Sequence, residues 1–183
     1  MAAPFATGPI PRRQFTITRP TFGQHYDVVS RDGQEHLFYI DVSCSFSRSQ
    51  PDLTVHAGPN TAAPVVAVAH MPKLSGPFKI GLGDPISHPN AVRWEDMMRR
   101  ASPLRRCRRN AHLFPRPAQL QARRRGDERG PAVFTSERGH SACGVLQVNT
   151  LWGPDFDLMV LTTCVATYEK ARRRSSGAAA ATA

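Results

Sequence analysis

Residue types that could perform catalysis or bind a metal are few in this chain, and their spacing is poor. His140 and Cys143 form an H-x-x-C pair, but no second pair completes the four ligands that a structural zinc site needs. Gly81-Leu-Gly83 is an isolated G-x-G that opens no helix, so we interpret it as a turn rather than a phosphate-binding loop. The sequence contains no G-x-S-x-G, H-E-x-x-H or P-loop motif. We therefore expect a protein that is not an enzyme and that uses no metal and no cofactor.

The remaining groups with binding chemistry are cations, and most of them lie in one segment. The chain carries a net charge of +10. Residues 99–129 hold 11 arginines and two acidic residues, a net charge of +9, which leaves about +1 for the rest of the chain. A segment rich in arginine, proline and alanine cannot bury enough apolar surface to fold. We expect residues 99–130 to be disordered, either as a natural basic insertion or as the product of a shifted reading frame or a retained intron.

One segment near the end of the chain predicts the element around which the rest must pack. Residues 155–174 follow Pro154, begin with two aspartates and end with three arginines, which suits the dipole of a helix. Residues 158–168 carry no charge, so this helix should be buried on all sides. These 11 residues are fewer than the roughly 20 that cross a membrane. We expect threonine hydroxyls to bond carbonyl groups one turn back, and the main core side chains to be Phe156, Leu158, Leu161, Cys164 and Val165.

Short alternating segments separated by turn residues predict strands before this helix. Asp32-Gly33 and Gly58-Pro59-Asn60 are typical of the turns in β-hairpins. The predicted strands cover residues 15–18, 25–29, 36–42, 53–57, 64–70, 78–82, 91–94, 132–136 and 144–149. A helix that is apolar on all sides must be surrounded by other elements, and a closed sheet is the simplest arrangement that surrounds it. We therefore predict a mainly β fold, an antiparallel β-barrel that encloses the C-terminal helix.

The composition of the remaining residues indicates how the chain is organised. Residues 15–174 are expected to form a single domain, with flexible tails at 1–14 and 175–183. The four cysteines are far apart and form no C-x-x-C pair. Without a signal peptide they indicate reduced thiols of an intracellular protein, cytoplasmic or peripheral to membranes, and we expect no transmembrane segment.

This combination resembles the tubby C-terminal-like superfamily, which includes the plant LURP-one-related proteins and the phospholipid scramblases. The resemblance covers residues 15–97 and 131–174. It is most specific in residues 143–149 followed by 155–166, where a final strand precedes an aspartate-rich helix start and a small-residue apolar helix. Residues 53–58, 66–68 and 79–84 also resemble fungal members of this superfamily. Such members imply a closed barrel with more strands than the nine predicted here, so the barrel is expected to be incomplete where residues 99–130 lie.

The resemblance implies a binding function. Tubby-type barrels bind phosphoinositide headgroups through Lys and Arg side chains, because phosphate oxygens accept hydrogen bonds from paired cations. The residues in this chain that fit such a role are Lys73, Lys79, Arg172 and Arg173, although they also fit ordinary solvated charges. The alternatives are a nucleic-acid or acidic partner bound by the basic segment 99–129, or a protein-interaction scaffold. Phe114 is the only aromatic residue in that segment, which makes nucleic-acid binding the weaker of these interpretations.

Overall fold

The chain folds into one sheet and one long helix in a computed structural model, which describes residues 13–21, 23–43, 50–71, 78–97, 111–112, 132–136 and 142–180. In chain order the elements are β1 (Arg13–Thr18), β2 (His25–Ser30), β3 (His36–Val42), β4 (Leu53–His56), β5 (Val65–His70), β6 (Phe78–Leu82), the 3-10 turn η1 (Pro89–Ala91), β7 (Arg93–Met97), β8 (Ala111–His112), β9 (Ala132–Ser136), β10 (Ala142–Val148) and the helix α1 (Pro154–Ala180).

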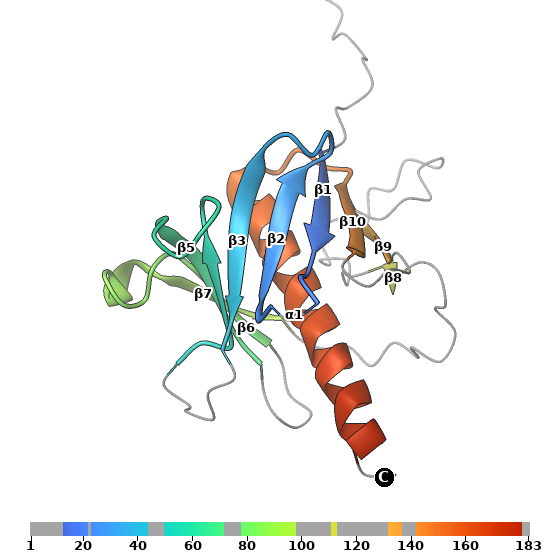
Figure 1. The fold of residues 1–183 in the computed structure, drawn as a ribbon. Coiled ribbons are helices and arrows are strands. Elements are labelled where there is room, and N and C mark those ends of the chain that lie inside the picture. The colour runs from blue at the N-terminus through green and yellow to red at the C-terminus, as the bar shows by residue number, and fades with distance from the viewer. Residues whose placement is uncertain are drawn as a thin grey trace, which may run out of the picture.

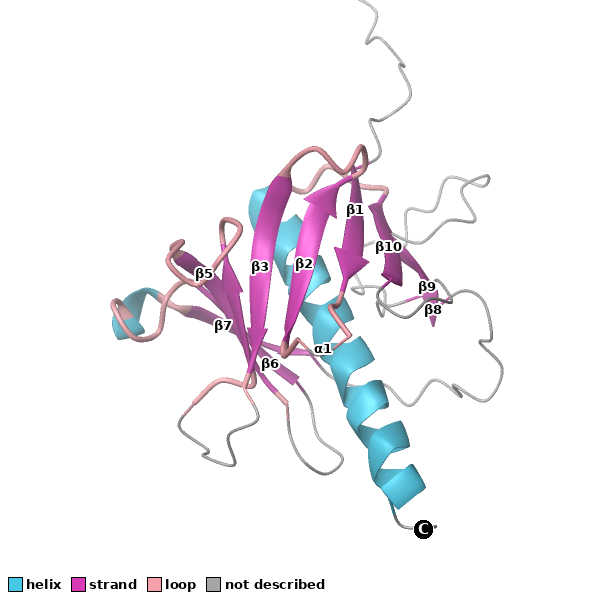
Figure 2. Ribbon diagram, viewed as in Figure 1, coloured by secondary structure: helices cyan, strands magenta, loops and turns pink. Residues whose placement is uncertain are grey.

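The strands form one antiparallel sheet in the order β7-β6-β5-β4-β3-β2-β1-β10-β9-β8. The chain meanders from β1 to β7 and then returns to place β10 beside β1. The sheet curves around the first part of α1, and the last turns of the helix extend past the strands (Figures 1 and 2). A mainly antiparallel sheet with a C-terminal helix is therefore confirmed. Within the described residues the sheet stays open, because its end strands β7 and β8 do not pair with each other.

The predicted hairpins are confirmed. Strands β2 and β3 pair across a turn in which Gly33 has a φ of 71°, a left-handed conformation that glycine adopts without strain. Strands β4 and β5 also pair with each other, and so do β6 and β7. In β1 and β2 the buried apolar side chains alternate with half-buried ones, as period-2 patterning requires. This alternation places the core on the concave face of the sheet.

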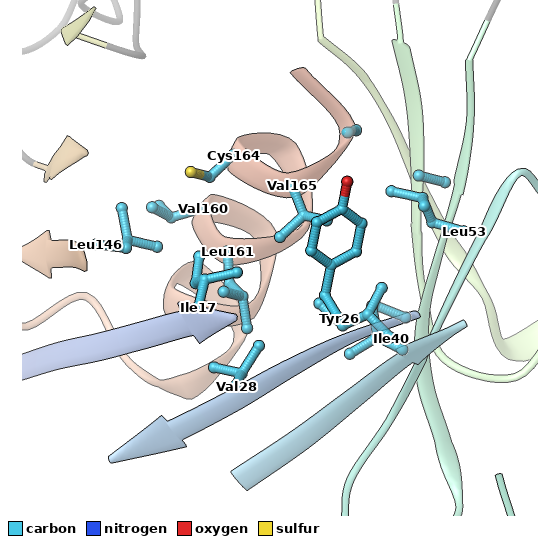
Figure 3. Close-up of a cluster of buried hydrophobic side chains, with 14 of the residues drawn as sticks. Ile17, Tyr26, Val28, Ile40, Leu53, Leu146, Val160, Leu161, Cys164 and Val165 are labelled. Carbon is cyan, nitrogen blue, oxygen red and sulfur yellow. The ribbon is translucent and has the colours of Figure 1, made fainter. Parts of the chain in front are cut away.

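The core of the molecule lies between that concave face and α1. Residues 160–166 of the helix are buried in succession, so burial on all sides is confirmed for this part of the predicted stretch 158–168. Of the predicted core side chains, Leu161, Cys164 and Val165 are buried, whereas Phe156 and Leu158 are only half-buried. Side chains from β1, β2, β3, β4 and β10 point at the helix, and Tyr26 lies near its centre (Figure 3). The hydroxyls of Thr162, Thr163 and Thr167 donate to the carbonyl oxygens one turn earlier at 2.7–2.8 Å. These bonds remove the cost of burying a hydroxyl, as predicted.

The bounds of β1, β2, β4, β5 and β10 differ from those predicted by one or two residues, and three larger differences concern α1, β7 and β8. The helix continues to Ala180, beyond the predicted end at residue 174, because alanines follow Gly177 and propagate the helix through it. The strand expected at 91–94 lies at 93–97, because residues 89–91 form the turn η1. The two-residue strand β8 lies inside segment 99–130, where no strand was predicted, and pairs with β9. Residues 98–110 and 113–131 are outside the described part, and so are residues 1–12 and 181–183. Of the tails expected at 1–14 and 175–183, residues 13–14 belong to β1 and residues 175–180 to α1.

Candidate functional site: the arginine cluster where the helix leaves the sheet

Charged side chains converge where α1 passes the ends of the strands. The cluster consists of Arg19, Tyr26, Asp52, Glu169, Arg172 and Arg173. Arg19 follows β1, Tyr26 lies on β2, and Asp52 immediately precedes β4, so a single helix turn meets three segments of the sheet. Because consecutive strands are antiparallel, the end of one strand and the start of the next lie at the same edge of the sheet. The topology therefore brings residues from distant parts of the chain to one place.

Glu169 is the centre of this cluster, and its side chain is fully buried. Its Oε2 accepts a hydrogen bond from the Tyr26 hydroxyl at 2.6 Å and one from Arg172 Nε at 2.8 Å. Its Oε1 accepts from an Arg172 terminal nitrogen at 2.9 Å and from Arg173 Nε at 2.8 Å. Arg19 adds a cation whose nitrogen lies 3.6 Å from Oε2. Both carboxylate oxygens thus accept two hydrogen bonds, which is what a buried charge requires.

These contacts control the ionisation of the groups involved. Burial by itself raises the pKa of Glu169, but the hydrogen bonds from Arg172, Tyr26 and Arg173 outweigh burial and lower that pKa to about 2. Burial and the adjacent carboxylate raise the pKa of Tyr26 well above its ordinary value. The pKa of Arg172 is raised by its hydrogen bonds to Glu169. At neutral pH the cluster therefore holds an ionised carboxylate, a neutral phenol and charged guanidinium groups.

Arg173 and Asp52 extend the cluster to the segments that follow β3 and β5. Arg173 donates to Asp52 Oδ1 at 3.3 Å and to the carbonyl oxygen of Ser43, the residue after β3, at 3.1 Å. The second oxygen of Asp52 accepts a hydrogen bond from the backbone nitrogen of Met71, after β5, at 2.7 Å. The helix turn at residues 169–173 is thereby connected through polar contacts to the segments that flank β1 through β5. These contacts fix the position of the basic turn relative to the sheet.

The cluster has more positive than negative charge, and the two signs are differently exposed. Three arginines share Glu169 and Asp52, which leaves an excess of one positive charge. Arg174 is exposed in the same turn, and Lys170 lies with Nζ 4.9 Å from the centre of the Phe78 ring. The side chains of Arg172 and Arg173 are 39% and 36% exposed, while that of Glu169 is 0% exposed. The surface of the site is therefore cationic above a buried anion.

The predicted headgroup-binding residues do not all lie in this cluster. Arg172 and Arg173 lie together in this cluster, where both hold Glu169. Lys79 is exposed on the outer face of β6, at the strand end nearest Lys170, and pairs in register with His70 and Asp96. Lys73 lies outside the described residues. The sequence interpretation omitted Arg19, Tyr26, Asp52 and Glu169, although Glu169 stands three and four residues before the two arginines, a spacing that predicts helical ion pairs.

Within the described residues, the groups that the sequence offered for metal or phosphate binding do not form a second site. No group of three or more His, Cys, Asp and Glu side chains with metal-binding geometry exists among the described residues. Cys143 is buried, and His140 is outside the described part. Gly81 lies within β6, where a Cβ atom would come within 3.0 Å of the Trp94 ring, and Gly83 has a φ of 116° in the following turn. Asp157, at the start of α1, forms an ion pair with Arg13 on β1.

Two further observations concern the length and apolarity that a membrane-spanning helix needs and the similarity of this chain to known proteins. In the part of the chain that the structure describes, no helix is both long enough and apolar enough to span a membrane. Neither the protein-family models, the curated proteins nor the solved structures contain a match to this chain.

Proposed function

We propose that this chain is a tubby-like barrel protein that binds anionic phospholipid headgroups at a membrane surface. In this proposal the described sheet is the larger part of an incomplete barrel around α1. The protein acts without catalysis, is peripheral to intracellular membranes, and presents the end from which α1 emerges to the lipid. A phosphate group is the chemical feature that the site recognises.

The observation that supports this proposal is the separation of charge in the arginine cluster. Glu169 is buried and holds Arg172 and Arg173 in place, while their exposed parts face solvent beside Arg174. Arginines that are already positioned lose little side-chain entropy when they bind phosphate, and their N–H groups match its oxygens. Lys79 is an exposed cation near the same end of the sheet. Each Lys or Arg near an anionic membrane contributes about 1 kcal/mol of attraction.

The test is co-sedimentation of the purified full chain with vesicles. Vesicles of phosphatidylcholine alone are compared with vesicles that also contain phosphatidylserine or a phosphatidylinositol bisphosphate. The variants are Arg174→Glu and Lys79→Glu, which change exposed cations near the helix exit and leave Glu169 and its partners intact. The matched control is Arg31→Glu, the same change in the exposed β2–β3 turn at the opposite end of those strands.

The expected result is binding to the anionic vesicles only. Reversing one charge at the site should weaken binding by about 2 kcal/mol, which is roughly 30-fold, because one attraction is lost and one repulsion is gained. Arg31→Glu should change binding less than about threefold, because the charge lies about six residues along the strand, or about 20 Å, from the site. Equal losses in all three variants would indicate attraction by net charge and contradict a site at the helix exit. A preference for the bisphosphate over phosphatidylserine at equal charge would identify the headgroup.

A further inference from the structure

A second polar surface lies on the convex face of the β2–β3 hairpin, away from the arginine cluster. Four side chains form it: His25 and Asp27 from β2, and Tyr39 and Asp41 from β3. In the register of the two strands His25 is opposite Asp41, and Asp27 is opposite Tyr39. Side chains two residues apart point to the same face of a sheet. The two carboxylates therefore lie on diagonal corners of a square, with an aromatic ring at each of the other corners.

The rings of this surface, which we call the Tyr39 platform, are stacked. The His25 and Tyr39 rings lie 4.8 Å apart between centroids with an angle of 22° between their planes. On β4, the His56 ring packs edge-on against the Tyr39 ring, with 6.1 Å between the ring centroids and 63° between the ring planes. The Nδ1 atom of His56 lies 2.9 Å from the carbonyl oxygen of Ala63, so this ring is held in place. The platform is therefore a positioned aromatic surface and not a set of independent side chains.

The platform has hydrogen-bond acceptors in excess of donors. Among the described residues, the only basic side chain within 4.0 Å of either carboxylate is His25, whose Nε2 is 3.6 Å from Asp27. That distance is beyond hydrogen-bond range. Burial, together with the carboxylates of Asp41 and Asp27, raises the pKa of Tyr39, which means that both carboxylates act on its phenol. Each of these residues is partly exposed. A ligand with a positive charge and several N–H groups would neutralise the two carboxylates and supply the missing hydrogen-bond donors.

We propose that the Tyr39 platform is a docking site for an arginine side chain of a basic peptide segment. A guanidinium group is planar, so it can extend the stack of His25 and Tyr39, and its five N–H donors can bind Asp27, Asp41 and the Tyr39 hydroxyl. A lysine ammonium group supplies the charge but has no plane to stack. Charge complementarity supports this partner. Residues 25–42 contain Asp27, Asp32, Glu35 and Asp41 against one arginine, an acidic hairpin in a chain whose net charge is +10.

The test uses the purified full chain and two fluorescent probes of equal charge, hexa-arginine and hexa-lysine. Binding is measured by fluorescence anisotropy at low salt for the wild type, Asp41→Asn and Tyr39→Leu. The matched control is Glu35→Gln, which removes one carboxylate from the same hairpin outside the platform. All variants are compared by thermal unfolding first. If Tyr39→Leu fails to fold, Tyr39→Phe together with Asp41→Asn decides the question.

The wild type is expected to bind hexa-arginine several-fold more tightly than hexa-lysine, because only the guanidinium stacks. Asp41→Asn should weaken hexa-arginine binding about tenfold, and Tyr39→Leu about threefold, while Glu35→Gln changes it by less than about twofold. Three results would overturn the proposal: no binding by the wild type, equal affinity for both probes, or an equal loss in Glu35→Gln and Asp41→Asn. This test does not involve lipid, so its outcome is independent of headgroup binding.

Discussion

Replacing Glu169 by glutamine tests whether the buried carboxylate holds the helix in the sheet. The change keeps the size of the side chain and removes its charge. The three arginines would then share a neutral amide, and the four hydrogen bonds that Glu169 accepts at 2.6–2.9 Å would weaken or break. Breaking a buried ion pair by removing one partner costs about 3–5 kcal/mol.

The depressed pKa of Glu169 supports the same magnitude. Its folded-state pKa is about 2, below the ordinary value of 4.5. Each pKa unit corresponds to about 1.4 kcal/mol, so ionised Glu169 contributes about 3 kcal/mol to the folded state. Because the folded-state pKa is the lower one, this contribution is complete above pH 4.5 and is lost as the pH falls toward 2.

Urea unfolding followed by circular dichroism measures the effect. At neutral pH Glu169→Gln should lose about 3 kcal/mol of unfolding free energy, or about 6–12 °C in Tm. The difference from the wild type should shrink steadily between pH 4.5 and about 2. The control is Glu95→Gln, whose side chain is 49% exposed and 3.8 Å from Arg93. It should change stability by less than about 0.5 kcal/mol. A Glu169→Gln variant within about 1 kcal/mol of the wild type, or a difference that does not depend on pH, would refute the reasoning.

Three further changes test the packing around this site. Tyr26→Phe removes a hydroxyl that donates to the buried carboxylate at 2.6 Å, and urea unfolding should show a loss of about 1.5–3 kcal/mol. Gly144→Ala should prevent or severely weaken folding, because the φ of Gly144 is 148° and a Cβ atom there would lie 2.2 Å from a backbone oxygen of β9. Gly33→Ala is the matched control: open space surrounds Gly33, so a thermal melt should show a loss of only about 1–2 kcal/mol. Leu161→Arg should abolish soluble expression, because the side chain is 1% exposed, whereas Ile86→Arg at an 84% exposed position should leave the yield unchanged.

The elements of this fold could be predicted because their signals are local. The β3, β6 and β9 bounds match the expected ranges, since alternation and turn residues are read within a few positions. The helix interior was equally clear, because a run without charge has no exposed face. The exact end of α1 was harder to place. Gly177 is typical of a helix end, but the alanines that follow it favour continuation.

The arginine cluster could be predicted only in part, because most of its contacts join distant parts of the chain. Tyr26 and Glu169 are separated by 143 positions, and Arg173 and Asp52 by 121. The sequence identified Arg172 and Arg173 as cations at a helix end, but it did not reveal that the sheet buries Glu169 beneath them. The short spacing from Glu169 to these arginines was the available signal. The strand β8 offered no such signal, since two residues are too few to show a period.

Hydrogen exchange of the α1 backbone, followed by mass spectrometry of the full chain, measures whether the sheet encloses the helix. Residues 160–166 lie inside the curved sheet, and Glu169 connects the helix to that sheet. Amides in this stretch should therefore exchange only through global unfolding, as slowly as those of the central strands β2 and β3. In Glu169→Gln their exchange should accelerate in proportion to the lost stability. Exchange of residues 160–166 as fast as that of the exposed turn at 31–33 would show that the sheet does not enclose the helix.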